Sequence, residues 1–394
     1  MTSVEKAIQL CLEKTNLGNI EELHLSNLKD GFLSADLYSS INLPSFRNSA
    51  MDGYALLYSD YEKGLREFKI TGEIKAGDTN TYNLDSGTVY RIFTGAPTPL
   101  NCDLVIMQEH IARKDNQIII EEENSKPNQN IRQIGEQVKE GDLALSKGSE
   151  LNSASIGYLA SIGAATIKSI SAPKVTVVST GDELVAQNQE LKFGQIYESN
   201  SFGLLTELKK TGITQLNFSK LKDDYQETLL KIKELIETQD YLILTGGISV
   251  GDYDFVGEAL KELEVEEVFY KVAQKPGKPL FFGRKNNCHI FALPGNPAAA
   301  LTCLHIYVKS SIRKYRGGSD CEPKFRMVRA ENNFIKKGNR AQFLKAKMNA
   351  NSVSILEGQS SNMMHTFAVA NTLVYLDENT EEIKVGDLVK SLLI

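Results

Sequence analysis

The second half of the chain alternates between two patterns of hydrophobic positions. Short, uninterrupted apolar runs are typical of buried strands, and the segments between them place apolar residues at helical spacing. The predicted strands and helices cover, in order, residues 174–179, about 200–210, 213–220, about 225–238 and about 297–315. Asn296 and Pro297 suit the N-cap and first-turn positions of the last helix. This alternation predicts a doubly wound, mostly parallel sheet with helices on both faces over residues 173–316.

Shorter strand-like runs, separated by Gly, Asp and Asn, occupy the flanking regions. Residues 66–144 fit a mostly antiparallel β module with a hairpin at Lys114-Asp-Asn-Gln. The last 75 or so residues fit a second β module. The N-terminal segment predicts an amphipathic helix in which Thr2 and Glu5 form a capping box. The apolar face of that helix comprises Val4, Ala7, Ile8 and Cys11.

These patterns predict an α/β multidomain protein, with one doubly wound sheet domain, two smaller β-rich modules and a linking segment. The expected divisions are an N-terminal helix on the α/β domain (1–20), a linking domain (21–44 with 141–172), a β-rich domain (45–140), the α/β domain (173–316) and a C-terminal β domain (317–394).

Composition excludes several classes of function. A chain of 394 residues with 41% hydrophobic and 24% charged residues fits a soluble globular protein of two to four domains. The net charge of −6 and the absence of a basic tract argue against nucleic acid as the main partner. No apolar run approaches the ~18 residues of a membrane span, and no signal peptide is evident. Five scattered cysteines without C-x-x-C spacing predict reduced thiols in a cytoplasmic protein.

The most informative segment is a glycine-rich loop after an apolar strand. The strand over residues 241–244 ends at Thr245, and Gly246, Gly247, Ser249 and Gly251 follow before another helical pattern. Glycines at such a place let the backbone approach an anion, so the loop predicts a phosphate or oxyanion site. The glycine spacing matches neither a Walker A loop nor a dinucleotide fingerprint. A plain tight turn is the alternative.

Five further segments place polar residues directly after or before apolar runs. Asp52 precedes Gly53 and Thr94 precedes Gly95, where simple turns are the alternative. Glu183 follows a predicted strand at the sheet edge where α/β proteins bind ligands. The remaining two segments are a lysine-rich turn with Lys271 and Lys275, which could instead be a solvated face, and the helix start at Pro294, Gly295, Asn296 and Pro297.

Anion-binding loops, lysines and carboxylates together suit one kind of chemistry. The five histidines show no ligand spacing, and His305 fits a core position within an apolar helix. Carboxylates beside phosphate loops fit a hard cation such as Mg²⁺. The residues therefore predict Mg²⁺-assisted chemistry on a phosphorylated or nucleotidylated small molecule, whose identity they leave open.

A series of motifs in a fixed order narrows the choice of substrate and reaction. The motifs that follow one another along the chain are Pro44-Ser-Phe-Arg-Asn-Ser-Ala-Met-Asp-Gly-Tyr-Ala, Thr94-Gly-Ala-Pro-Thr-Pro, Asn130-Ile-Arg-x-x-Gly-Glu, Ser179-Thr-Gly-Asp-Glu-Leu, Thr245-Gly-Gly-Ile-Ser-Val-Gly-Asp-Tyr-Asp, Lys275-Pro-Gly-Lys-Pro and Leu293-Pro-Gly-Asn-Pro. This series resembles the molybdopterin molybdenumtransferase family, which includes the C-terminal domain of gephyrin. The resemblance is carried by residues from about 40 to 300, and the domain layout agrees over nearly the whole chain.

The resemblance implies insertion of molybdate into adenylylated molybdopterin with release of AMP, as a step of molybdenum cofactor biosynthesis. It also implies a homodimer held through the linking domain, with the site between the α/β domain of one subunit and the 45–140 module of the other. The adenylyltransferase that supplies the substrate is a further expected partner.

Site roles are carried over by motif position. The resemblance assigns catalytic roles to Asp52, Glu183, Asp254, Lys271 and Lys275. Mg²⁺ would be bound by Asp52, Glu183 and Asp254. The substrate-binding set would comprise Thr94, Arg132, Asp223, Thr245, Gly246, Gly247, Ser249, Gly251, Pro294, Gly295, Asn296 and Pro297.

One departure and two rival functions accompany this interpretation. The family has Asp where this chain has Gln137, so a metal-binding role at that position is in doubt. The rivals are a molybdopterin adenylyltransferase, which also has a Thr-Gly-Gly loop but lacks the additional modules, and a non-catalytic scaffold like gephyrin. AMP release that requires molybdate would discriminate among the three.

Overall fold

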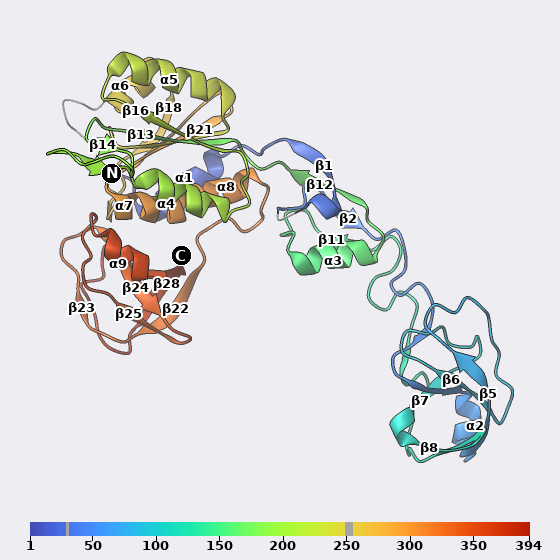
Figure 1. Ribbon diagram of the computed structural model, residues 1–394. Helices are drawn as coiled ribbons and strands as arrows, with labels where there is room; N and C mark the ends of the chain where they lie inside the picture. The colour runs from blue at the N-terminus through green and yellow to red at the C-terminus, as the bar shows by residue number, and fades with distance from the viewer. Residues whose placement is uncertain (29–30, 249–254) are drawn as a thin grey trace. The chain divides into compact units, whose positions relative to one another are not determined.

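The computed structural model describes residues 1–28, 31–248 and 255–394. The chain divides into two compact units. The first comprises residues 1–35, 147–152 and 167–394, and the second comprises residues 36–146 and 153–166. Figure 1 shows the α/β sheet and a C-terminal β module within the first unit, and a β-rich module within the second. The α/β multidomain class predicted from the sequence is confirmed.

The α/β domain is built on a six-stranded sheet with the order β16-β13-β17-β21-β20-β18. The first four strands run parallel, whereas β20 is antiparallel to both of its neighbours, so the sheet is mixed. Every residue of the central strands β13, β17 and β21 is buried, as their uninterrupted apolar runs predict. The strands are β13 (Val175–Thr180), β16 (Leu216–Leu221), β17 (Tyr241–Thr245), β18 (Glu266–Tyr270), β20 (Phe281–Lys285) and β21 (Cys288–Leu293).

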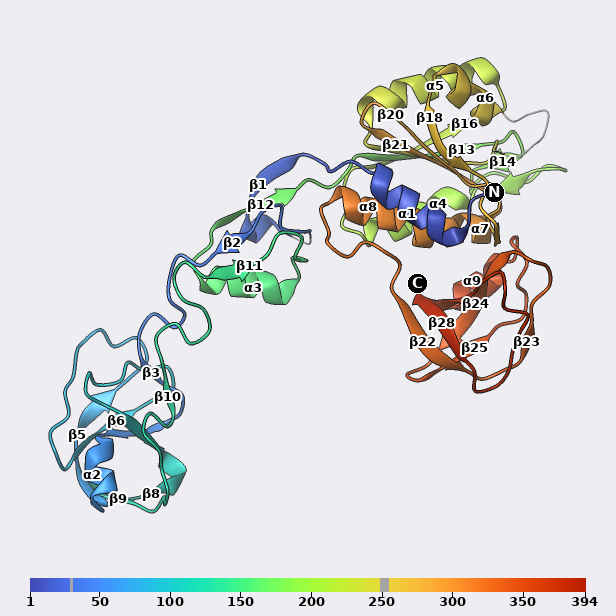
Figure 2. The same cartoon turned by 180° about the vertical axis from the view of Figure 1, so that it is seen from behind.

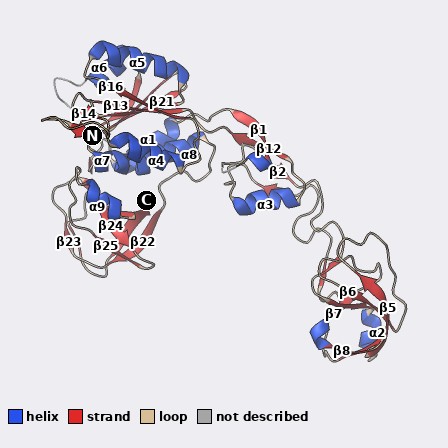
Figure 3. Ribbon diagram, in the orientation of Figure 1, coloured by secondary structure: helices blue, strands red, loops and turns tan. Residues whose placement is uncertain are grey.

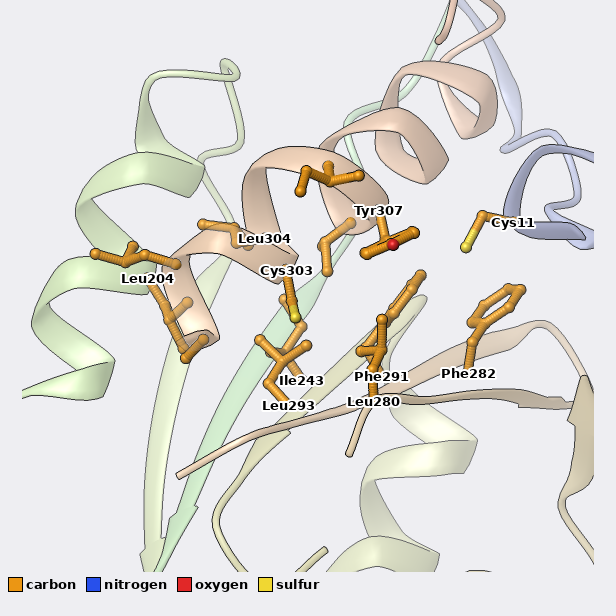
Figure 4. Packing of buried hydrophobic residues seen from close by; sticks show 14 of the residues in the cluster. Cys11, Leu204, Ile243, Leu280, Phe282, Phe291, Leu293, Cys303, Leu304 and Tyr307 are labelled. Carbon is orange, nitrogen blue, oxygen red and sulfur yellow. The ribbon is translucent and has the colours of Figure 1, made fainter. Parts of the chain in front are cut away.

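Helices cover both faces of this sheet (Figure 3). α5 (Tyr225–Thr238) and α6 (Phe255–Glu262) pack on one face. The other face is covered by α1 (Val4–Lys14), α4 (Asn200–Lys209), α7 (Pro297–Cys303), the π-helical turn η3 (Leu304–Val308) and α8 (Lys309–Tyr315). Figure 4 shows side chains of these helices meeting side chains of the sheet in the main hydrophobic core. The helices predicted over about 200–210, 225–238 and 297–315 are confirmed.

The N-terminal helix α1 begins differently from the prediction. Ser3, rather than Thr2, is the N-cap, and its Oγ accepts a hydrogen bond from the Lys6 N–H at 3.2 Å. Thr2 instead lies before the helix, where its backbone N–H donates to the carbonyl of Lys271 at 3.0 Å. A local capping pattern cannot reveal this competing long-range bond. The predicted apolar face of α1 is buried, as expected.

The C-terminal β module is a closed barrel (Figure 2). Its strand order is β19-β24-β25-β22-β28-β26, and an additional pairing of β26 with β24 closes the ring. Closure leaves few exposed strand edges. The parallel strand β19 is contributed by the segment between β18 and β20, so the barrel is tied to the α/β domain. The elements are β19 (Gln274–Lys275), β22 (Phe325–Ala330), β23 (Phe334–Ile335), β24 (Ala341–Met348), β25 (Ser352–Ile355), α9 (Met364–Val369), β26 (Thr372–Leu376), β27 (Glu382–Ile383) and β28 (Leu388–Leu393).

The β-rich module of the second unit is a six-stranded sheet with the order β7-β4-β6-β5-β9-β8. Its pairings are antiparallel except for β5 with β6, and the predicted hairpin joins β8 to β9. Two apolar clusters form its core. Its elements are β4 (Gly53–Leu56), α2 (Tyr58–Glu62), β5 (Glu67–Ile74), β6 (Thr88–Ile92), β7 (Leu104–Met107), η2 (Gln108–His110), β8 (Ile111–Lys114) and β9 (Gln117–Ile120).

Several short elements complete the chain. The remaining elements are β1 (Ile20–His24), η1 (Leu25–Asn27), β2 (Leu37–Tyr38), β3 (Asn48–Ser49), β10 (Ile131–Arg132), β11 (Leu143–Leu145), α3 (Ser153–Ser161), β12 (Thr166–Ile170), β14 (Leu184–Val185) and β15 (Ile196–Tyr197). All five cysteines are buried and free. Among the described residues, no helix has the length and apolar character needed to cross a bilayer.

We expect the stability of the α/β domain to fall on acidification because of His289, which is fully buried. Its Nε2 accepts from the Asn16 N–H at 3.0 Å, which requires the neutral ring. Burial lowers the pKa of His289 from 6.5 to about 4. The unfolded state therefore binds the additional proton, and stability is lost as pH falls from about 6.5 to 4, by roughly 3 kcal/mol.

Thermal melting of the full chain across this pH range checks the expectation. His289→Gln keeps a donor and an acceptor but cannot titrate, so its melting temperature should fall less steeply between pH 6.5 and 4. His365→Gln, at an exposed histidine, is the matched control and should follow the unmodified protein. Equal slopes for all three proteins would contradict the assignment.

Candidate functional site

A cavity with a volume of about 710 Å³ lies at the carboxyl ends of β13, β17 and β21 in the α/β domain. This is the sheet edge at which α/β proteins bind ligands. The cavity brings together eight residues predicted from the sequence, namely Glu183, Thr245, Gly246, Gly247, Pro294, Gly295, Asn296 and Pro297. Ser249, Gly251 and Asp254 lie outside the described residues.

The glycine-rich turn after β17 requires glycine for two reasons. Gly246 and Gly247 have φ angles of +90° and +59°, which side-chain-bearing residues rarely adopt. A Cβ on Gly246 would lie 2.8 Å from the backbone oxygen of Thr180, at the end of β13. The turn therefore packs directly against the neighbouring strand.

A second turn, Pro294-Gly-Asn-Pro, packs against the first. A Cβ on Gly295 would lie 3.6 Å from the Cα of Gly246, so the two turns approach to van der Waals contact. Asn200, at the start of α4, bridges them, because its Nδ2 donates to Thr245 Oγ1 at 2.7 Å and to the Gly295 carbonyl at 2.8 Å. The sequence analysis missed Asn200, since its partners lie 45 and 95 residues away along the chain.

The position of Asn200 depends in turn on Glu198, a buried carboxylate that also lines the cavity. Glu198 Oε1 accepts from Ser179 Oγ at 3.0 Å and from the Ser201 N–H at 2.9 Å. The carboxylate therefore joins β13 to the first turn of α4, where a negative charge is favourable. Glu198 was also missed, because it precedes a helix whose start carries no clear capping pattern.

Three carboxylates lie on loops at or beside the cavity, and Glu183 is the one that lines it. The Glu183 side chain folds back over Gly181, where an added Cβ would lie 2.5 Å from Glu183 Oε2. Asp182 and Asp223 accept from each other's backbone N–H groups at 3.3 Å. Asp223 is thereby held beside the loop that carries Glu183, although it does not line the cavity itself.

The two predicted lysines lie outside the lining of this cavity. Lys271 Nζ is 4.6 Å from the ring centroid of Tyr270, whose hydroxyl donates to the Ile248 carbonyl beside the glycine turn at 3.1 Å. Lys275 lines a separate cavity of about 230 Å³ at the C-terminal barrel. The lysine-rich turn is thus an ordered segment that joins the α/β domain to the barrel.

Gln274 anchors this turn and was missed by the sequence analysis. It is fully buried, and its Nε2 donates to the Pro276 carbonyl at 2.9 Å. Its Oε1 accepts from the hydroxyl of Tyr307, which lies on the π-helical turn η3. The extra residue in η3 changes the helical phase, so no spacing rule could have predicted this contact.

The C-terminal barrel contributes to the cavity wall through Asn362 and Met364. Asn296 occupies the N-cap position of α7 as predicted, but its side chain makes no capping bond. Its Nδ2 instead donates to Ser361 Oγ of the barrel at 3.1 Å. The predicted N-cap position of Asn296 and first-turn position of Pro297 are confirmed, and the Asn296 amide links the start of α7 to the C-terminal module.

In the second unit, Asp52 and Thr94 come together as the motifs suggested. Asp52 Oδ1 accepts from both the N–H and the hydroxyl of Thr94, each at 2.8 Å. The backbone N–H, the hydroxyl and the nearby Arg91 guanidinium hold the pKa of Asp52 below its usual value, so the side chain is an anion at neutral pH. Arg132 is exposed on β10, opposite Asn48 on β3.

Family models match nearly the whole chain. They are described as the MoeA N-terminal region (domain I and II), over residues 2–163, a probable molybdopterin binding domain, over residues 176–314, and the MoeA C-terminal region (domain IV), over residues 327–394.

Relatives and solved structures agree with these models. A molybdopterin molybdenumtransferase of Haemophilus influenzae is 36% identical over 376 residues, which are 94% of this chain and 92% of the relative. One from Staphylococcus epidermidis is 30% identical over 400 residues, covering 99% and 95% of the two chains. The crystal structure of the molybdopterin biosynthesis protein MoeA from Pyrococcus horikoshii superposes with a TM-score of 0.79 at 27% identity, covering 100% and 99%. The chain therefore belongs to the molybdopterin molybdenumtransferase family.

Proposed function

We propose that this enzyme transfers molybdenum from molybdate to the dithiolene of adenylylated molybdopterin and releases AMP. The observation that carries the proposal is the pair of turns held together by Asn200 at the floor of the 710 Å³ cavity. Glycine turns at this sheet edge suit the phosphates of a nucleotidylated ligand. The cavity volume is in the range of small-molecule sites.

The proposed roles of the site residues follow from the charge of each side chain and from its position in the structure or in the family motifs. Thr245, Gly246, Gly247 and the Pro294–Pro297 turn would hold the adenylate, with Asp223, Thr94 and Arg132 as further substrate contacts. Lys271 and Lys275 are cations that suit the oxygens of molybdate or phosphate. The anion of Asp52 would orient the reacting groups. Glu183 and Asp254 complete the proposed catalytic set.

Mg²⁺ fits the chemistry of the donors. Asp52 is held as an anion by Thr94, and among the described residues no hydrogen bond is made to its Oδ2. Within residues 1–28, 31–248 and 255–394, no three acidic, His or Cys side chains gather closely enough to form a metal cluster. Mg²⁺ commonly uses one or two carboxylates together with substrate phosphate oxygens. We propose that Mg²⁺ binds to carboxylates from the set Asp52, Glu183 and Asp254 together with phosphate oxygens of the substrate, whose charge it would neutralise.

The decisive experiment measures AMP release from adenylylated molybdopterin by the purified enzyme. We expect release to require molybdate and Mg²⁺, and sulfate to be a poor substitute for molybdate. Release at the same rate without molybdate would overturn the proposal. AMP-moiety transfer from ATP to molybdopterin would identify an adenylyltransferase, and binding of the substrate without turnover would identify a scaffold.

The departure at Gln137 gives a separate prediction. Its side chain is exposed, and its backbone N–H donates to the Leu43 carbonyl at 2.9 Å. Gln137→Ala should therefore cost tenfold or less in turnover, the scale of one neutral hydrogen bond at ~1 kcal/mol. Gln137→Asp, which restores the family residue, should be tolerated. A folded but inactive Gln137→Asp enzyme would show that a negative charge here opposes the reaction.

We also propose a homodimer that acts in the cytoplasm. A symmetric dimer is the commonest assembly of soluble proteins, and five free buried thiols suit a reducing compartment. Light scattering should give twice the 43.7 kDa mass of the chain. A fully active monomer at micromolar concentration would contradict the dimer. The adenylyltransferase that supplies the substrate is proposed as a transient partner.

A further inference from the structure

Lys345 is a buried cation in the C-terminal barrel with an unusual set of partners. It lies on β24 with 3% of its surface exposed. Its Nζ donates to the carbonyls of Gly358 at 2.7 Å, Ser360 at 2.9 Å and Met363 at 3.1 Å, which uses all three ammonium hydrogens. Among the described residues, no carboxylate lies within ion-pair distance. The ammonium is therefore satisfied entirely by the loop that follows β25.

A second side chain fastens the same loop to the same strand. Gln359 Oε1 accepts from the Lys345 N–H at 2.9 Å, and Gln359 Nε2 donates to the Lys345 carbonyl at 2.8 Å. This pair occupies both backbone hydrogen-bonding groups of Lys345. Together, Lys345 and Gln359 fix the loop over residues 358–363 at four points.

This loop ends at the substrate cavity. Ser361 Oγ accepts from Asn296 Nδ2, and Asn362 lines the cavity with Met364. Ser361 and Asn362 lie in the chain between Ser360 and Met363, whose carbonyls accept from the ammonium of Lys345. A buried ammonium is costly unless its hydrogens are all paired, so the loop has one strongly favoured arrangement. Burial also lowers the pKa of Lys345.

We propose that Lys345 is a positioning residue for substrate binding, because it holds the 358–363 loop against the Pro294–Pro297 turn. The C-terminal barrel thereby completes the wall of the cavity, although Lys345 does not line that cavity itself. This inference rests on the proposed function and extends it to a residue in a different module.

The test compares Lys345→Met with Lys347→Met in the full-length enzyme. Methionine preserves most of the volume of lysine but cannot donate. Lys347 lies on the same strand and is exposed, so it is a matched control. We expect Lys345→Met to raise KM for adenylylated molybdopterin about tenfold, with kcat within about threefold of the unmodified enzyme. Lys347→Met should change neither. Unchanged KM in Lys345→Met would overturn the proposal, as would an equal loss in both variants.

A double-mutant cycle separates positioning from a general loss of stability. Ser361→Ala removes the contact with Asn296 at a partly buried position of the loop and should raise KM about threefold. If Lys345 acts through the loop, Ser361→Ala should have almost no further effect in the Lys345→Met background. Additive effects would overturn the proposal. Should Lys345→Met fail to fold, unchanged KM in Ser361→Ala alone would overturn it. An unmodified enzyme without molybdate-dependent AMP release would instead refute the proposed function.

Discussion

Replacing Gly246 by alanine is expected to lower kcat/KM for molybdenum transfer by roughly a hundredfold, the scale at which a small displacement of a binding group registers. The added Cβ would lie 2.8 Å from the Thr180 backbone oxygen and 3.0 Å from its Oγ1. Thr180 ends a strand buried along its whole length, so it cannot yield. The glycine turn must move instead, and with it the contact to Gly295. The strain should cost about 1–3 kcal/mol of stability.

Gly64→Ala is the matched control for this prediction. Gly64 has the same φ of +90°, but an added Cβ would meet no atom within 4 Å. This variant carries the backbone cost of about 1 kcal/mol without the collision, and its activity should be unchanged. Steady-state kinetics and thermal melting of both variants show whether the loss of activity comes from the collision with Thr180 or from the backbone strain alone. A fully active Gly246→Ala enzyme would show that the turn does not contact substrate.

Asp52→Asn should reduce turnover by roughly a hundredfold or more, the scale of a lost electrostatic contact in a transition state. The amide keeps an oxygen that can accept from the N–H and hydroxyl of Thr94, so the local structure should persist. We therefore expect the melting temperature to stay within a few degrees. Because the pKa of Asp52 is lowered in the folded protein, its charge is favoured there, and removing it should not increase stability.

Asp78→Asn provides the comparison within the same unit. The Asp78 carboxylate also has a lowered pKa, because it accepts from the Asn80 N–H and the Tyr82 hydroxyl. It belongs to none of the site motifs, so its variant should keep full turnover. If Asp52→Asn melts several degrees lower yet turns over normally, Asp52 is a structural residue and its catalytic assignment is wrong.

Several features of the fold follow from local sequence. Uninterrupted apolar runs at residues 241–244 and 290–293 produce strands that are buried along their length, as a sheet covered on both faces requires. Adjacent glycines at 246 and 247 indicate the turn that only glycine permits. These signals are readable because each one arises from residues close together in the chain.

The contacts that assemble the cavity and the lysine-rich turn were decided by tertiary structure. Asn200, Gln274 and Lys345 are polar residues whose partners are distant or lie in irregular loops, so no periodicity marks them. The N-cap of α1 is Ser3 rather than the predicted Thr2, because the Thr2 backbone pairs with a segment about 270 residues away. The sequence by itself determined the strands, the glycine turns and the family motifs. Only the folded chain decided which side chains hold them together, because a buried polar group must find a partner wherever the packing places one.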